Sequence, residues 1–261
     1  MSAPASGVVR GSIDLDRSLR EGWQAVMRNP APAFLGYLVY FALSMFFGIA
    51  SRIPYVGMMS TIAKLIIEPA LGGGLLILFL NLLYRRQPSV ENVFAGISKF
   101  GRFLGATLLL GGLLVGLMIP GAVILILAAV IEMPSNEGTI VLVIAGAVAL
   151  LAGIVAYVTY WLRWMFAPWV IADDWEEGSI ITAFKRSAQL TQGHRLKLLL
   201  VTFVIGLIGA AGVLACCVGT IFTAPIAGCA TGAIYCDLKS FYFSAYAQRQ
   251  ASSTTPAPPN P

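Results

Sequence analysis

Six long apolar runs divide the chain, and its positive charges lie almost entirely on one side of them. The runs cover residues 33–50, 58–83, 104–131, 139–166, 196–215 and 218–243. A helix needs about 20 apolar residues to cross a bilayer. Of the 17 Lys and Arg residues, only Arg52 and Lys64 lie on the side opposite to both termini. Because cytoplasmic loops carry the excess of Lys and Arg, the pattern predicts a multi-pass membrane protein with both termini in the cytoplasm.

The composition supports this class of protein. Hydrophobic residues make up 58% of the chain and charged residues 11%, whereas a soluble domain has about 25% charged residues. The net charge of +5 comes from the predicted cytoplasmic loops, so it indicates an anionic membrane surface as partner and not nucleic acid. The apolar runs are continuous and do not alternate, which favours helices over a β-barrel.

The runs group into three similar units, at about residues 13–84, 89–166 and 179–246. Segments that start at Ser18 (SLREGWQAVMRNP) and Ala183 (AFKRSAQLTQGHR) align without gaps, and each precedes an odd-numbered run. In the middle unit, an amphipathic segment is predicted to place four apolar residues on one face: Val90, Val93, Phe94 and Ile97. The predicted fold is therefore an all-α membrane protein of six transmembrane helices. They form three helical hairpins, each preceded by an amphipathic interfacial helix and arranged as parallel repeats about the membrane normal. Chance similarity between hairpins is the alternative.

The two ends of the chain differ from this domain in composition. Residues 1–11 and the Pro- and Ser-containing segment 248–261 (which ends in ASSTTPAPPNP) lack apolar periodicity, so we predict that both are disordered. The six-helix transmembrane domain is then expected to cover residues 12–247.

At its third unit the chain resembles a group of uncharacterised bacterial six-span membrane proteins. These are related to the membrane domain attached to some glycerophosphodiester phosphodiesterases. The similarity lies in AFKRSAQLTQGHRLKLLL, in GTIFTAPIAG and in AIYCDL. It covers the third unit well and the first loosely. It implies a bacterial inner-membrane location and a fold, and it provides no catalytic residues, because the phosphodiesterase catalytic domain is not part of the resemblance.

Lys64 and Glu68 are the first candidate ligand-binding residues. They lie four residues apart in the second run, hence on one helical face. Ionisable groups inside a membrane commonly mark a functional site; the alternative is that Lys64 extends to the interface and neutralises Glu68. The repeat alignment adds Asn81 and its counterpart Asp237 to this candidate site. Asp237 has two further interpretations, as a partner of Arg163 or as an interfacial residue.

The start of the fifth run carries a candidate site for lipid headgroups. His194, Arg195 and Lys197 form a cationic cluster there, which can attract anionic lipid or only anchor the helix by its charge. The acidic loop ADDWEEGS, residues 172–179, offers carboxylates to a divalent cation, but Ser179 and the acids before it also suit the start of a helix. We predict no metal and no cofactor.

These features predict a non-enzymatic inner-membrane protein that binds lipid, a protein partner or a second copy at the cell envelope. The alternative is a small-molecule transporter or exporter with its site around Lys64 and Glu68. An enzyme acting on lipids would need several titratable groups at one depth, and Glu68 and Asp237 are expected in opposite halves of the bilayer.

Overall fold

The computed structural model describes residues 14–130, 136–174, 179–214 and 218–254, and in those ranges all regular secondary structure is helical. The elements, in chain order, are α1 (Leu15–Arg28), α2 (Pro30–Ala50), α3 (Val56–Leu83), η1 (Val90–Val93), η2 (Ala95–Lys99), α4 (Phe100–Val130), α5 (Asn136–Trp164), α6 (Ala167–Ala172), α7 (Ile180–Leu190), α8 (Arg195–Leu214) and α9 (Val218–Thr254).

Six of the described segments are long and apolar enough to cross a membrane, as the sequence predicts. They are Pro30–Ala50, Val56–Leu83, Val90–Val130, Gly138–Ala172, Arg195–Gly212 and Gly219–Ser244. Their outer surfaces are apolar: Phe46, Met58 and Val155 each expose more than 60% of their area. An exposed apolar surface of this extent requires lipid or another apolar partner. The chain is therefore a multi-pass membrane protein.

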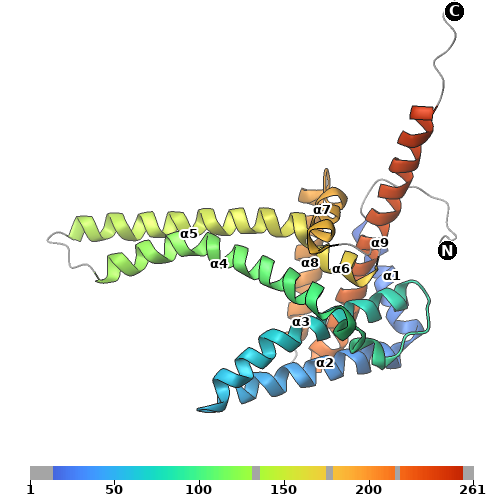
Figure 1. Cartoon of the computed structure of the whole chain (residues 1–261), viewed down its shortest axis with the longest axis horizontal. Helices are drawn as coiled ribbons and strands as arrows, with labels where there is room; N and C mark the ends of the chain where they lie inside the picture. The colour runs from blue at the N-terminus through green and yellow to red at the C-terminus, as the bar shows by residue number, and fades with distance from the viewer. Residues whose placement is uncertain (1–13, 131–135, 175–178, 215–217, 255–261) are drawn as a thin grey trace, which may run out of the picture.

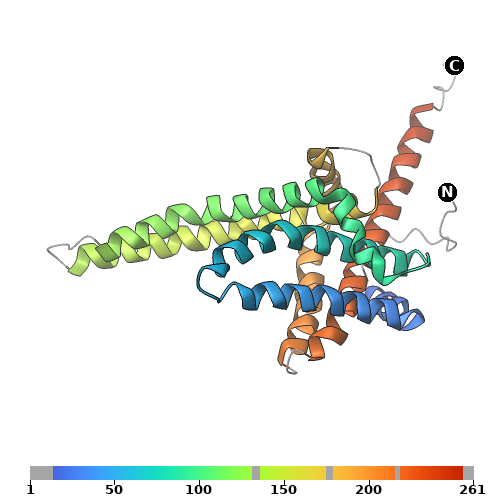
Figure 2. The same cartoon turned by 60° about the horizontal axis from the view of Figure 1, so that its bottom comes forward.

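Consecutive long helices pack against each other, α2 on α3, α4 on α5 and α8 on α9. The α2–α3 and α4–α5 pairs extend in the same general direction, whereas the α8–α9 pair runs across them (Figures 1 and 2). The three pairs thus do not share the single direction predicted for parallel repeats. The crossing is close because α9 has Gly228 where it meets α3, and the Phe79 ring occupies the space that a side chain would need.

The segments that precede the odd-numbered spans differ in structure. Helix α1 begins at an Asp14 cap, and α7 begins at a Ser179 cap. The middle segment instead forms the two 3₁₀ helices η1 and η2. Val93 is completely buried while Phe94 and Ile97 are about half exposed, so the prediction of one shared apolar face was wrong. A 3₁₀ helix has three residues per turn, so residues 90 and 93 lie on one side of it and residues 94 and 97 on another.

The C-terminal helix is longer than predicted. Helix α9 continues to Thr254, although disorder was expected from residue 248. Ala247, Gln248 and Arg249 favour a helix, and the first proline of this segment comes only at Pro256. The predicted boundary is therefore too early. Residues 1–11 and 255–261 lie outside the described part of the chain.

The core lies where α3, α6 and α9 meet, near the ends of the spans that carry the positive charges. The second half of α3 contributes Leu78 and Leu82, α6 contributes Ile171, and α9 contributes Ile234, all at most 1% exposed. The outer halves of the α4–α5 pair extend away from this core (Figure 1). Polar side chains near the core are consequently held by several helices at once.

Candidate functional site

The predicted charge pair forms within helix α3. Lys64 Nζ lies 3.9 Å from Glu68 Oε2, and the two side chains are 35% and 40% exposed. The pair follows from helical geometry, since residues four apart lie on one face. Pro69 comes next inside the same helix. At 1.5 Å per residue, Glu68 lies about 18 Å from the first residue of α3, which is close to the helix midpoint.

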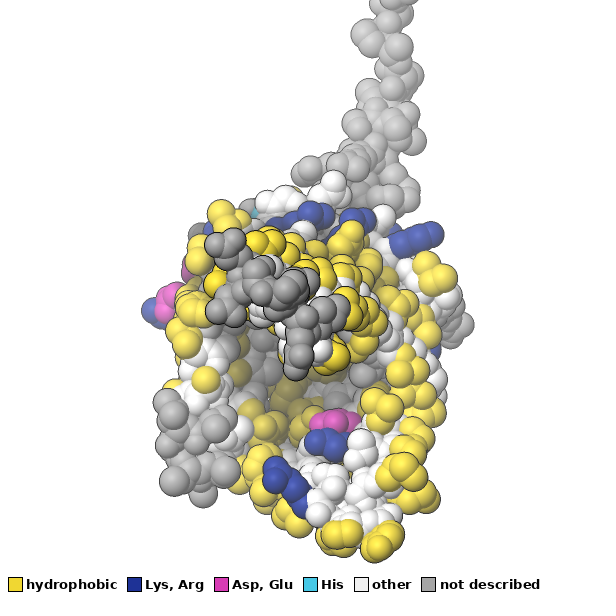
Figure 3. Space-filling view, turned by 90° about the vertical axis from the view of Figure 1, so that its left-hand side faces the viewer, with side chains coloured by type: hydrophobic (Ala, Val, Ile, Leu, Met, Phe, Trp, Pro, Cys, Tyr) yellow, Lys and Arg dark blue, Asp and Glu magenta, His cyan; other side chains and the backbone are white. Residues whose placement is uncertain are grey.

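Helix α2 supplies a neighbour of this pair. The Ser44 hydroxyl donates a hydrogen bond to Glu68 Oε1 at 3.2 Å. The face seen along the tips of the α2–α3 and α4–α5 pairs is hollowed, and an acidic and a basic side chain lie together in the hollow (Figure 3). At 35% and 40% exposure, the Lys64–Glu68 pair is not enclosed by packed protein.

The other two residues of this predicted site lie elsewhere. Asn81 is half-buried, 13 residues and about 20 Å further along α3. Asp237 of α9 pairs with Arg17 of α1 at 3.7 Å. Arg163 is exposed and does not pair with Asp237. The prediction of an Asp237–Arg163 pair was therefore wrong. The structure therefore brings together Lys64 and Glu68 and adds Ser44 to them.

The cationic cluster lies on the surface at the start of α8. His194 packs edge-to-face on the Phe241 ring of α9 at 6.0 Å, while Arg195 and Lys197 are exposed. The exposed Arg195 and Lys197 side chains can contact an anionic surface, whereas His194 lies at the contact between α8 and α9.

A buried polar network that the sequence analysis did not predict surrounds Asp173, directly after α6. The Asp173 side chain is 5% exposed. Its Oδ2 accepts hydrogen bonds from the hydroxyls of Tyr84 at 3.1 Å and Tyr235 at 3.0 Å, and it pairs with the Lys239 ammonium. Tyr84 follows α3, and the other two belong to α9. One carboxylate therefore joins three parts of the fold.

The neighbouring Asp174 extends this network to α4. Lys99 Nζ lies 2.5 Å from Asp174 Oδ2 and donates to the carbonyl oxygens of Ile171 at 3.3 Å and Ala172 at 3.1 Å. Arg102 adds a longer ion pair to Asp174 at 3.6 Å. The acids of this loop that the structure describes are thus neutralised by Lys and Arg, and no group of three metal-ligating side chains occurs among the described residues. Glu176 and Glu177 lie outside them.

Two groups outside the membrane-spanning segments have shifted pKa values, Tyr84 and Arg17. Burial raises the pKa of the Tyr84 hydroxyl far above its usual value, and the adjacent Cys236 and Asp173 raise it further. Tyr84 therefore stays a hydrogen-bond donor across the physiological pH range. The hydrogen bond from Arg17 to Glu21, with the charge of Asp237, raises the pKa of the Arg17 guanidinium. Asp173 thus keeps a hydrogen-bond donor in Tyr84, which supports a structural role for this network.

One sequence signal points to this junction in retrospect. Tyr235 and Lys239 lie four residues apart in α9 and so share a helical face. A lysine and a tyrosine on one face near the end of a span can both donate to one acidic partner, and the acids of the 172–179 loop are the densest group in the chain.

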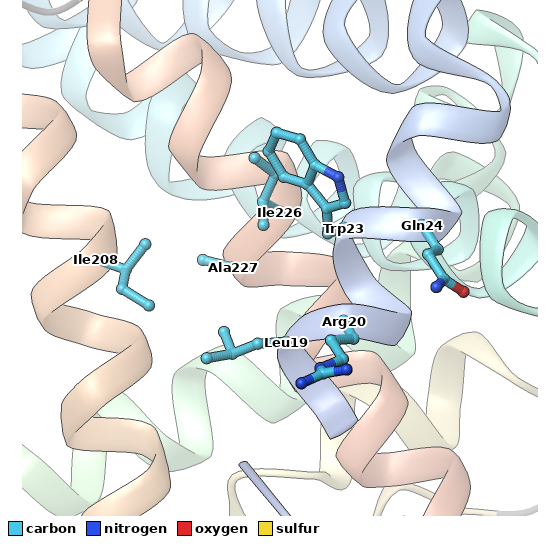
Figure 4. Close-up of a pocket in the computed structure, with 7 residues that line it drawn as sticks. All are labelled: Leu19, Arg20, Trp23, Gln24, Ile208, Ile226 and Ala227. Carbon is cyan, nitrogen blue, oxygen red and sulfur yellow. The ribbon is translucent and has the colours of Figure 1, made fainter. Parts of the chain in front are cut away.

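A pocket lies between α1, α8 and α9. It has a volume of about 290 Å³ and is lined by Leu19, Arg20, Trp23, Gln24, Ile208, Ile226 and Ala227. Helix α1 forms one wall with four of these residues, α8 contributes Ile208, and α9 contributes the remaining two (Figure 4). The exposed surface of the lining is almost entirely apolar, and the Arg20 guanidinium is paired with Asp16 of the same helix at 2.9 Å.

Helix α1 is fixed tightly at this position. A Cβ at Gly22 would lie 2.6 Å from the backbone nitrogen of Ala230, so only glycine permits this approach of α1 to α9. The Arg17–Asp237 pair holds the helix one to two turns earlier. The pocket between α1 and α8 is therefore a built feature of the fold.

One family matches this chain over nearly its whole length. It is described as a domain of unknown function, DUF7847, and the match covers residues 13–258. The chain belongs to the DUF7847 family. Neither a curated protein nor a solved structure matches it. The DUF7847 match includes every helix from α1 to α9, so the α1–α8–α9 pocket, the Lys64–Glu68 pair and the Asp173 network all lie inside one family domain. The relation of this DUF7847 chain to the membrane domain of glycerophosphodiester phosphodiesterases stays a prediction.

Proposed function

We propose that this multi-pass membrane protein is a non-enzymatic lipid-binding protein of the bacterial inner membrane, with both termini in the cytoplasm. Its site is the α1–α8–α9 pocket, and its ligand is an anionic phospholipid. The observation that carries the proposal is an almost entirely apolar pocket beside the amphipathic helix α1. Ile208, Ile226 and Ala227 suit an acyl chain, and a lipid phosphate would replace Asp16 as the partner of Arg20.

The size and surroundings of the pocket support a lipid. A volume of about 290 Å³ lies at the lower limit of small-molecule pockets, so it fits one part of an acyl chain while the rest stays in the bilayer. Trp23 is 52% exposed beside it, and tryptophan is enriched at the level of lipid headgroups. Helix α1 has polar and apolar faces, as helices that lie at an anionic membrane surface do.

The cationic side chains at the start of α8 also support binding of anionic lipid at this end of the molecule. Arg195 and Lys197 are exposed on one of the helices that line the pocket. Each Lys or Arg near an anionic leaflet contributes about 1 kcal/mol of attraction. They would concentrate anionic lipid at this end of the molecule, and Arg20 would select it at the pocket.

The double substitution Arg20→Gln/Trp23→Ala tests this site. Loss of one cation costs about 1 kcal/mol, and loss of the indole contact costs at least as much. We therefore expect at least tenfold weaker retention of phosphatidylglycerol. The measurement is native mass spectrometry of protein released from nanodiscs with equal amounts of phosphatidylglycerol and phosphatidylcholine. Arg85→Gln, which removes an exposed cation from the loop after α3, is the matched control. Equal phosphatidylglycerol retention in all three proteins would refute the proposal.

A second candidate function is transport of a small molecule along the hollow beside Lys64 and Glu68. It is favoured by the exposure of the pair at the middle of α3 and by Pro69, because interrupted helices line substrate sites in transporters. Glu68→Gln is then expected to abolish uptake or efflux while the protein still inserts. The measurement is flux of labelled small solutes in proteoliposomes, with Glu91→Gln as the control. Unchanged flux in Glu68→Gln would exclude transport through this site.

A further inference from the structure

The Lys64–Glu68 pair leaves much of its bonding capacity unused. Their 3.9 Å separation is too long for a hydrogen bond. An ammonium group has three donors, and within the described part of the chain this ion pair is the one polar contact of Lys64. Glu68 Oε1 accepts from Ser44, and Oε2 faces the lysine at the longer distance. Both charged groups can therefore take further partners.

The position of the pair makes this capacity significant. Lys64 and Glu68 lie about 12 Å and 18 Å along α3 from its first residue, inside a segment long and apolar enough to cross a membrane. Charged groups at such a depth are costly, yet these side chains are more than one-third exposed, and the face along the tips of the helix pairs is hollowed (Figure 3). A ligand on the exposed side of α3 would reach both charges at once.

The charges determine what kind of ligand fits. The pair is neutral overall, so a ligand with a single charge would satisfy one member and leave the other without its partner, which is unfavourable in an apolar environment. A ligand with one cationic and one anionic group satisfies both. Its ammonium group would meet Glu68 beside the Ser44 hydroxyl, and its anionic group would meet Lys64.

We propose that Lys64, Glu68 and Ser44 form a binding site for a zwitterion that carries a primary ammonium and a phosphate or carboxylate a few atoms apart. Two sources share this chemistry: the headgroup of phosphatidylethanolamine, which enters from the bilayer, and a free zwitterionic solute, which enters through the hollow. The site is separate from the anionic-lipid pocket of α1, α8 and α9, and neither proposal depends on the other.

The test uses the full chain in nanodiscs and the substitution Lys64→Gln/Glu68→Gln. This double variant removes both charges together and leaves no charge unpartnered, so it is expected to insert and fold at least as well as the wild type. In one arm, nanodiscs contain phosphatidylethanolamine and phosphatidylglycerol in equal amounts, and retained lipid is counted by native mass spectrometry. In the other arm, nanodiscs of phosphatidylcholine are titrated calorimetrically with phosphoethanolamine and with glycine.

We expect the double variant to bind the zwitterion at least tenfold more weakly in one of the two arms. The arm that responds identifies the source. Arg52→Gln, which removes the other cation on this side of the membrane, is the matched control and should bind as the wild type does. Equal binding by wild type and double variant in both arms, or no zwitterion binding by the wild type in either, would overturn the proposal. Loss of phosphatidylglycerol alone in Arg20→Gln/Trp23→Ala would still support the other site.

Discussion

Asp173→Ala is expected to lower the free energy of unfolding by about 3–5 kcal/mol, the cost of removing one partner from a buried ion pair. The carboxylate is 5% exposed and serves the Lys239 ammonium and two tyrosine hydroxyls. Without it, the ammonium stays 21% exposed with no carboxylate at that position, and the hydroxyls of Tyr84 and Tyr235 lose their acceptor. Because these residues follow α3 and belong to α9, the loss should loosen the contact between the helix pairs.

The measurement is unfolding of purified protein in detergent, followed by tryptophan fluorescence, because Trp169 stacks on Tyr235 at the network. Asp16→Ala is the control, since its ion pair with Arg20 is more than 70% exposed on both sides and should contribute at most about 1 kcal/mol. Asp173→Ala combined with Lys239→Ala should cost less than the sum of the two single changes. Equal stability of Asp173→Ala and Asp16→Ala would show that the network does not hold the helix pairs together.

The contrast between the two charged sites shows which contacts a sequence can predict. Lys64 and Glu68 pair because they are four residues apart in one helix, and helical geometry alone brings them together. Tyr84 and Lys239 lie 89 and 66 positions from Asp173, so their meeting depends on how α3, α6 and α9 pack. The same reason explains Asp237: charge alone allowed Arg163 as its partner, and the packing of α1 on α9 brings Arg17 instead.

The six long helices were predictable because length and hydropathy are local properties of each run. Their mutual directions were not, because these depend on a few contact points where small residues allow backbones to approach. Gly228, beneath the Phe79 ring, and Gly22, against Ala230, are two such points. Neither glycine differs in the sequence from others that face open space, such as Gly112 and Gly116.

The three consecutive glycines of α3 lead to the second large effect. Gly74→Ala should lower the free energy of unfolding by about 3 kcal/mol, the upper end of what overpacking costs. An added Cβ at Gly74 would overlap the backbone carbonyl of Val93, and one at Gly96 would overlap the carbonyl of Ala70. Backbone meets backbone here, so no side-chain rotation can relieve the overlap. The contact of α3 with η1 and η2 must open instead.

Gly72→Ala is the matched control for this prediction, because a Cβ there meets nothing within 4 Å. The same chemical change two residues away should leave stability unchanged or raise it by up to about 1 kcal/mol, the difference in helix propensity between glycine and alanine. The measurement is the same detergent unfolding experiment applied to both variants. If the two alanine variants had equal stability, Val93 and Gly96 would not lie against α3. If Gly74→Ala alone is destabilised, the close approach at Gly74 and Gly96 positions the end of η2 and the start of α4. Lys99 and Arg102 are thereby held opposite Asp174.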